Sequence, residues 1–214
     1  MTRVSAGIFL ALVASLLVGA RFGYVWAGGE GYEPNLAVRL VAGEGIEGDR
    51  GGRIRPVVEG DVFVRGERIM TGDAERALVQ IGKVLLALDE RTDVVLERTN
   101  ASGITLRLVR GRIVVVADPS VEETIVLTNK TESGIIEGAL SVVNYDFQQA
   151  VQVVPIGTVA YVLTDAGATL TTTPVFIQEA DPITIEDSTF DPTDANIAAF
   201  YQWAEDATDY QINQ

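Results

Sequence analysis

Apolar side chains recur at every second position, or in short β-branched runs, through most of the chain between Leu36 and Leu170, and Gly, Asp and Asn interrupt them at short intervals. Strict alternation, as in residues 104–108, is typical of a strand with one buried face. Continuous β-branched runs are typical of strands buried on both faces, and they occupy residues 113–116, 124–128 and 159–163. The pattern predicts an all-β domain over residues 36–170, built as an antiparallel β-sandwich or jelly roll.

Three segments repeat a strand, a glycine and a second strand, and we interpret each as a β-hairpin. They are residues 79–84 around Gly82, residues 106–116 around Gly111 and residues 151–162 around Gly157. In the last segment, Pro155 and Gly157 fit the second and fourth positions of a type I turn. The separations between the segments are too unequal for a solenoid repeat.

An unbroken apolar run from Val4 to Ala20 follows a single positive charge at Arg3. Its length of about 25 Å as a helix suits a signal peptide or a short membrane anchor. Small residues before Arg21 and before Gly28 suit cleavage by signal peptidase, whereas the aromatic residues between these two sites suit a retained anchor at a membrane interface. Residues 1–27 are therefore a signal peptide or an anchor helix, residues 28–35 a linker, and we expect the rest of the chain outside the cytoplasm.

Beyond residue 170 the chain becomes rich in Thr, Pro and acidic residues, and residues 171–214 are expected to form an acidic strap with one amphipathic helix at about 192–207. Asp191 would cap this helix and Pro192 would begin it. Its apolar face consists of residues at helical spacing, Ile197, Phe200, Tyr201 and Ala204, and Trp203 widens this face. The helix either docks on the sandwich or binds a partner.

The charge distribution and the missing residue types exclude several functions. Net charge is −14, and residues 131–214 contain 13 acidic residues and no basic one. A nucleic-acid-binding protein needs a basic stripe, so we expect no nucleic-acid partner. The chain contains no His and no Cys, which removes His-based triads, thiol nucleophiles and zinc sites built on these side chains. We expect a protein that is not an enzyme and that carries no cofactor and no metal.

Two motifs suggest ligand-binding sites that their sequence context does not support. Residues 43–48 match the GxGxxG pattern, but a loop follows them and Glu44 and Glu47 would repel a pyrophosphate, so we interpret them as a glycine-rich turn between strands. Asp187, Asp191 and Asp194 lack the spacing of a calcium-binding loop.

Six residues are candidates for partner binding. The first three, Arg107, Arg110 and Arg112, flank one expected hairpin. They either bind an anionic partner or pair with the acidic C-terminal segment of the same chain. We favour the pairing within the chain, since that segment has no basic residue of its own. The second group consists of the helix residues Phe200, Tyr201 and Trp203.

The stretch from Glu59 to Ile81, with its Gly60-Asp61 and Thr71-Gly72 pairs, resembles the opening of the FecR domain. The likeness continues through residues 84–88, 92–96 and 106–116 to 151–163, and covers roughly residues 36–170. One departure is Gly138-Ala139, where the family usually has Gly-Thr.

The FecR resemblance implies a role in signalling. FecR-type regulators span a membrane, sense an outer-membrane iron-siderophore receptor and control a sigma factor. Met1 to Arg3 offer no counterpart of their sigma-binding segment. We therefore expect a stand-alone, exported FecR-like domain that binds a protein or a cell-envelope glycan, in envelope or transmembrane signalling. The alternative is a structural surface protein whose β domain assembles through the C-terminal helix.

Overall fold

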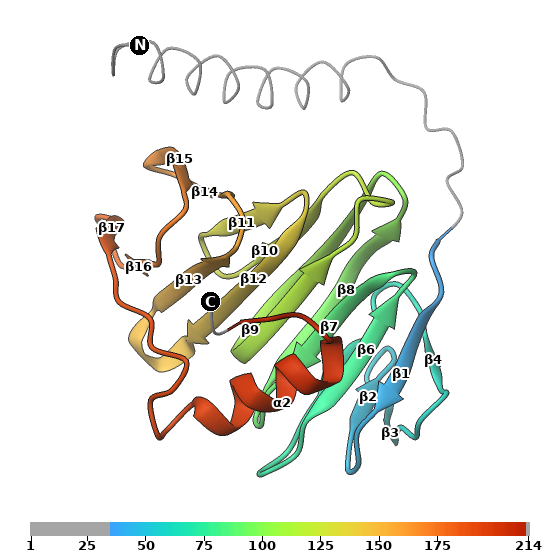
Figure 1. Cartoon of the computed structure of the whole chain (residues 1–214). Coiled ribbons are helices and arrows are strands. Elements are labelled where there is room, and N and C mark those ends of the chain that lie inside the picture. Colours follow the sequence, from blue (N-terminus) through green and yellow to red (C-terminus); the bar gives the residue numbers. More distant parts are fainter. Residues whose placement is uncertain (1–34, 213–214) are drawn as a thin grey trace, which may run out of the picture. The chain divides into compact units, whose positions relative to one another are not determined.

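The structure, a computed structural model, describes residues 35–212, and within them it is a β-sandwich with one α-helix, as the sequence pattern predicts (Figure 1). The first sheet, sheet A, contains in spatial order β3 (Ile54–Pro56), β2 (Glu47–Asp49), β5 (Arg68–Met70), β8 (Asp93–Asn100), β9 (Gly103–Ala117), β10 (Thr124–Leu127), β11 (Glu132–Ile135), β14 (Ala160–Thr164) and β15 (Gly167–Thr171). The second, sheet B, contains β4 (Val62–Phe63), β1 (Val38–Ala42), β6 (Ala77–Ile81), β7 (Val84–Leu88), β9, β12 (Gly138–Tyr145), β13 (Ala150–Ile156), β16 (Val175–Gln178) and β17 (Thr184–Asp187). All of these pairings are antiparallel except that between β9 and β10.

Strand β9 belongs to both sheets and joins them. Residues 103–110 pair with β8 in sheet A, whereas residues 111–117 pair with β12 in sheet B. The change of sheet falls at Gly111, whose φ of +92° lies in the region that favours glycine. A Cβ atom there would lie 2.5 Å from Oγ1 of Thr92 and 2.7 Å from its Cα. The corner of the sandwich therefore requires glycine, both for its dihedral angle and for the close approach of β8.

We expect Gly111→Ala to lower the free energy of unfolding by about 2–4 kcal/mol, because it adds steric overlap to the cost of a positive φ. Gly66→Ala is the matched control, since Gly66 has a φ of +84° but no atom within 4 Å of its Cβ position. Denaturant unfolding of both variants separates the two costs. Equal losses would show that the contact with Thr92 contributes nothing.

Only one of the three expected hairpins forms. Gly82, with a φ of +60°, closes the turn between β6 and β7, so that hairpin is confirmed. The other two predictions are wrong: residues 106–116 lie within β9, and residues 151–162 span β13 in sheet B and β14 in sheet A. A glycine with positive φ serves a bend or a change of sheet as well as a hairpin, and only the strand partners distinguish these cases.

The alternation of side chains along β9 creates two cores. Ile113 and Val115 point between the two sheets, whereas Val114 points to the outer face of sheet B. Helix α2 (Ala198–Thr208) covers that outer face, so residues 113–115 are buried on both sides, as predicted. The prediction is wrong for residues 159–163, because Val159 and Leu163 are exposed.

The C-terminal segment differs from expectation in two ways. Strands β16 and β17 extend sheet B beyond residue 170, so strand pairing continues to Asp187. The helix begins at Ala198, not at Pro192, and Asp191 is not its N-cap. The Asp191 carboxylate accepts a hydrogen bond from the backbone N–H of Thr193, and such local bonds hold a segment in turns.

Residues 35–212 contain no helix long and apolar enough to cross a membrane. The expected signal peptide or anchor at residues 1–27 and most of the linker at 28–35 lie outside the described residues.

Candidate functional site

The outer face of sheet B is an apolar platform that receives helix α2. Small and branched residues of β6, β7, β9, β12 and β13 form it: Leu78, Ala87, Val114, Ala139, Val154 and Ile156. Phe200 and Tyr201 are each 1% exposed and pack against this platform together with Ala204. The helix therefore docks on the sandwich, which is one of the two roles that the sequence left open.

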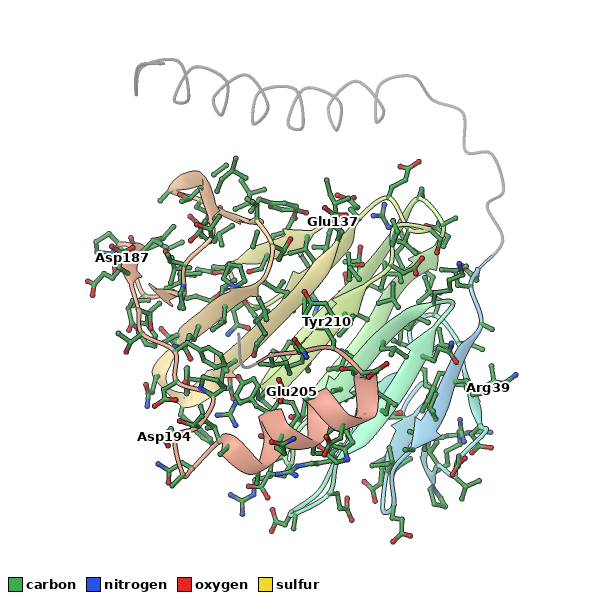
Figure 2. All side chains as sticks on the ribbon, in the orientation of Figure 1. Arg39, Glu137, Asp187, Asp194, Glu205 and Tyr210 are labelled. Atoms are coloured by element: carbon green, nitrogen blue, oxygen red, sulfur yellow. The ribbon has the colours of Figure 1, made fainter. Side chains whose placement is uncertain are left out.

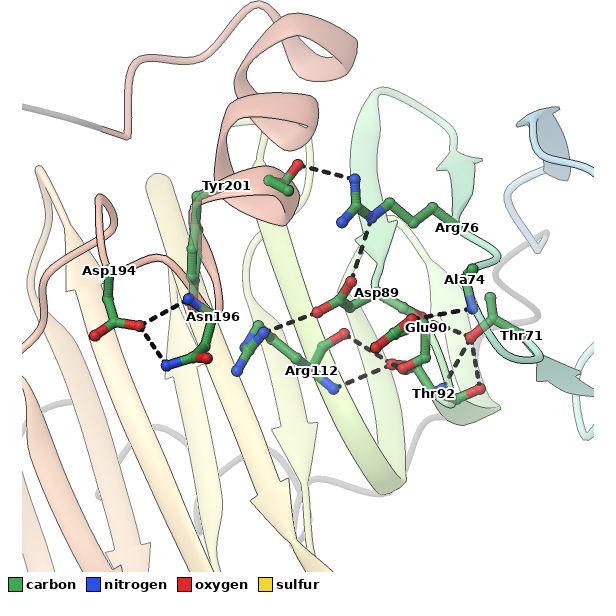
Figure 3. A network of polar contacts seen from close by, with 12 residues as sticks. Thr71, Ala74, Arg76, Asp89, Glu90, Thr92, Arg112, Asp194, Asn196 and Tyr201 are labelled. Atoms are coloured by element: carbon green, nitrogen blue, oxygen red, sulfur yellow. Dashed lines mark hydrogen bonds and ion pairs between the residues drawn. The ribbon is translucent and has the colours of Figure 1, made fainter.

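Arg76 and Arg112 share the carboxylate of Asp89, and both contact helix α2 (Figure 3). Arg76 donates to Oδ1 of Asp89 at 3.3 Å and to the backbone carbonyl of Ala199 in the helix at 2.8 Å. Arg112 donates to Oδ2 of Asp89 at 2.8 Å. Both guanidinium groups lie over the Phe200 ring at 5.9 Å. Sheet B thus presents cations to an aromatic helix face, and Asp89 fixes their positions.

The Tyr201 hydroxyl lies 2.8 Å from Oγ of Ser141 on β12. Burial raises the pKa of this phenol to about 12, and the hydrogen bond with Ser141 opposes only part of that effect. The hydroxyl is protonated at all physiological pH values, so it acts as a neutral hydrogen-bonding anchor of the helix.

The structure separates the six candidate residues into distinct environments. Arg107 lies in the sheet A half of β9 and pairs with Glu97, Arg110 is exposed at the corner opposite Asp93, and Arg112 lies beneath the helix. The expectation that these arginines pair with residues 131–214 is wrong for Arg107 and Arg112, whose carboxylate partners lie in the loops and strands of residues 89–97.

The two aromatic candidates with the most buried rings, Phe200 and Tyr201, face the platform, and Trp203 beside them is half-buried. In this conformation the first two offer no surface to a partner. Their role in partner binding stays a prediction, and it would require the helix to leave the sheet.

The Thr71-Gly72 pair of the FecR resemblance has a structural role here. The Thr71 hydroxyl donates to the carbonyl of Asp89 at 2.6 Å and accepts from the N–H of Thr92 at 2.8 Å (Figure 3). These bonds fix the end of β5 to the loop that presents Asp89. The motif therefore positions the carboxylate that both arginines share.

The other motifs occupy turns. Gly43 and Gly45 have φ values of +142° and +71° between β1 and β2, in agreement with a glycine-rich turn between strands. Asp194, like Asp191, accepts a bond from a backbone N–H two residues ahead, that of Asn196. Within residues 35–212, no group of three or more Asp, Glu, His or Cys side chains is arranged to hold a metal ion.

At the end of the sandwich formed by β3 and β4, a buried carboxylate joins β3 to the connections after β2 and after β4. Glu67 accepts hydrogen bonds from Arg50 at 2.9 Å, from Arg55 at 3.1 Å and from the backbone N–H of Val64 at 3.0 Å. Burial alone would raise the pKa of Glu67, but the hydrogen bonds from Arg50, Val64 and Arg55 outweigh it and lower that pKa below its usual value. The charge of this buried carboxylate is therefore neutralised within the domain.

The opposite end of the sandwich is open. A cleft of about 380 Å³ lies between β15 and β17, the last strands of the two sheets, and threonines of residues 169–173 line it together with Val175 and Ile185. Glu186 and Asp187 also line it, and both are exposed. Figure 2 shows Asp187 at one end of the sandwich and Arg39, on β1, at the other.

Strand β15 leaves one edge of sheet A unpaired. It pairs only with β14, and its sequence, Gly-Ala-Thr-Leu-Thr, contains no charged residue and no proline. Charges and prolines are the usual means by which edge strands avoid pairing with other chains. Sequence reasoning missed this edge, although the uncharged run of residues 166–173 was a visible signal for it.

The chain was compared with family models, with curated proteins and with solved structures, and two solved structures resemble part of it. No family model matches the chain, and no curated protein matches it either. Two crystal structures, each described as a "putative anti-sigma factor" from Parabacteroides distasonis, resemble it with a TM-score of 0.49 and 12% sequence identity. Each superposition covers 56% of this chain and 59% of the other.

Proposed function

We propose that this chain is a non-enzymatic, exported domain of the FecR type that binds another protein, in envelope or transmembrane signalling. The observation that carries the proposal is the open end of the sandwich, where an uncharged, unpaired strand borders a cleft. An extended segment of a partner can add to such an edge through main-chain hydrogen bonds, while side chains at alternate positions enter the cleft. The apolar run at Val4 to Ala20 supports export.

The FecR resemblance of residues 36–170 supports the signalling part of the proposal. In this domain the Thr71-Gly72 motif helps to hold helix α2 on sheet B, and β15 is a strand edge without charged residues that this helix does not occupy. A glycan would bind elsewhere, because main-chain groups of an edge strand match a peptide better than a sugar.

Because the chain contains no cysteine, a single introduced cysteine is its only site for thiol labelling. Ala168→Cys on β15 and, as matched control, Gln202→Cys on the exposed face of α2 are expressed in the native host. We expect a membrane-impermeant maleimide to label both in intact cells. A benzophenone attached at position 168 should then cross-link a partner that the same group at position 202 does not.

Mass spectrometry of the adduct must place the cross-link in one segment of the partner, and a synthetic peptide of that segment must bind the purified chain. Failure of labelling until the cells are lysed would refute export. Equal cross-linking from both positions, or none from position 168, would refute binding at β15.

A further inference from the structure

The two ends of the sandwich carry surfaces of different charge, and the surface at one end of a copy complements the surface at the other end of a second copy. The open end exposes the edge of β15 and the carboxylates of Glu186 and Asp187. Residues 131–214 contain no basic residue, so no nearby segment of the sequence supplies a cation to these acids. The opposite end lies around β3 and β4, at the other edge of both sheets (Figure 1).

The β3–β4 end, residues 53–65, carries four of the large apolar side chains that the described residues expose. Ile54 is 64% exposed and Val58 63%, and Val62 and Val64 are each nearly half exposed. Apolar residues gathered in so short a segment are typical of a contact surface. No comparable run of exposed apolar residues lies on α2, where Phe200 and Tyr201 are buried and Trp203 is half-buried.

The charges of this segment complement those of the open end. Arg55 pairs with Asp61 of the same segment and with the buried Glu67 just beyond it, so these two acids are already neutralised. Arg53 and Arg65 are exposed there, against one exposed carboxylate, that of Glu59. Arginine binds carboxylates in a bidentate manner. The acidic open end of one copy therefore suits the arginine-bearing end of another.

We propose that the chain assembles head to tail: the β3–β4 end of one copy docks on the β15 edge and the adjoining cleft of the next. The contact is heterologous, since the two surfaces differ, and a docked pair keeps one free surface of each kind. The assembly is therefore a chain of copies rather than a closed dimer. This inference rests on the proposed function, because it names the partner of the same edge strand as a second copy.

The test uses the full chain in detergent micelles, at micromolar concentration, with a short bismaleimide as the probe. Single variants Val58→Cys and Ala168→Cys are mixed with each other, and each is also treated alone. Docked copies hold two thiols at an effective concentration on the order of millimolar, so we expect the mixed product to exceed the Val58→Cys plus Gln202→Cys control at least about tenfold. The double variant Val58→Cys/Ala168→Cys should give a ladder of oligomers.

Charge reversal at the cleft provides a second measurement. In the Ala168→Cys chain, Glu186→Lys together with Asp187→Lys should reduce the mixed product several-fold, and added salt should reduce the product of the unreversed chain. Both acids are exposed, so the change leaves the core intact. Association through residues 1–34 would affect every pairing equally, including the control.

Products linking position 168 to 168, or 58 to 58, in preference to the mixed pair would overturn head-to-tail assembly. So would a mixed yield no higher than the control. If instead Ala168→Cys cross-links a different protein in cells while no ladder forms, the proposed function stands and this inference fails.

Discussion

Phe200→Ala should lower the free energy of unfolding by about 3–5 kcal/mol, the largest effect that we expect from a single substitution in this domain. The ring is 1% exposed and packs on the outer face of sheet B. Its removal leaves a cavity under α2 and takes away the ring over which Arg76 and Arg112 lie. The variant therefore loses both apolar burial and two cation–π contacts.

Chemical denaturation followed by circular dichroism measures this loss. Gln202→Ala, two positions further along the helix and exposed, is the matched control and should change stability by no more than about 0.5 kcal/mol. Hydrogen exchange of residues 198–208 adds a local readout. If Phe200→Ala were as mild as Gln202→Ala, the helix would not depend on this platform, and its docking would have another cause.

Glu67→Gln should cost about 2–3 kcal/mol at pH 7, because it removes the negative charge that Arg50 and Arg55 bind and leaves buried hydrogen-bond donors poorly paired. The figure is at the lower end of the range for broken ion pairs, since the side chain of Arg50 is 54% exposed and solvent compensates in part. The groups that Glu67 joins lie at the β3–β4 end, so the loss should begin there.

The pH dependence of this effect follows from the lowered pKa of Glu67. Its usual value is 4.5, and the folded state holds it lower, so the carboxylate stabilises the fold above about pH 4.5 and loses that contribution as pH falls through the folded pKa. The difference in stability between the original chain and Glu67→Gln should therefore shrink as pH falls from 6 towards about 3.

Parallel denaturant titrations across this pH range measure that difference. Glu59→Gln, an exposed carboxylate of the same loop region, should show no comparable dependence. A constant difference between the original chain and Glu67→Gln at every pH would mean that the ion pairs do not stabilise the folded state.

The alternation of apolar and polar residues was sufficient to predict the class of fold. Burial at every second position is a local property of a strand, so residues 104–108 reveal their buried face without knowledge of any partner. The β-branched run at 113–116 predicted a strand buried on both faces, and in the structure helix α2 covers its outer face. The helical spacing of Ile197, Phe200, Tyr201 and Ala204 predicted an amphipathic helix, and only the structure shows that this helix docks on sheet B.

The sequence could not place the corner of the sandwich or the candidate site. Gly111 and Gly82 are both glycines with positive φ inside β-branched segments, yet one bends β9 between sheets and the other closes a hairpin. Similarly, Arg112 and Arg107 are five residues apart on one strand, but the change of sheet between them places one under the helix and the other beside Glu97.

By itself, the sequence determined the all-β class, the C-terminal helix with its apolar face, and the unequal distribution of charge, because each depends on residue type and on spacing along the chain. The tertiary structure alone decided which glycine turns the chain and which carboxylate meets each arginine, and it left β15 as an unpaired edge. These features depend on contacts between residues far apart in sequence, and a strand's pattern of burial does not specify its neighbours.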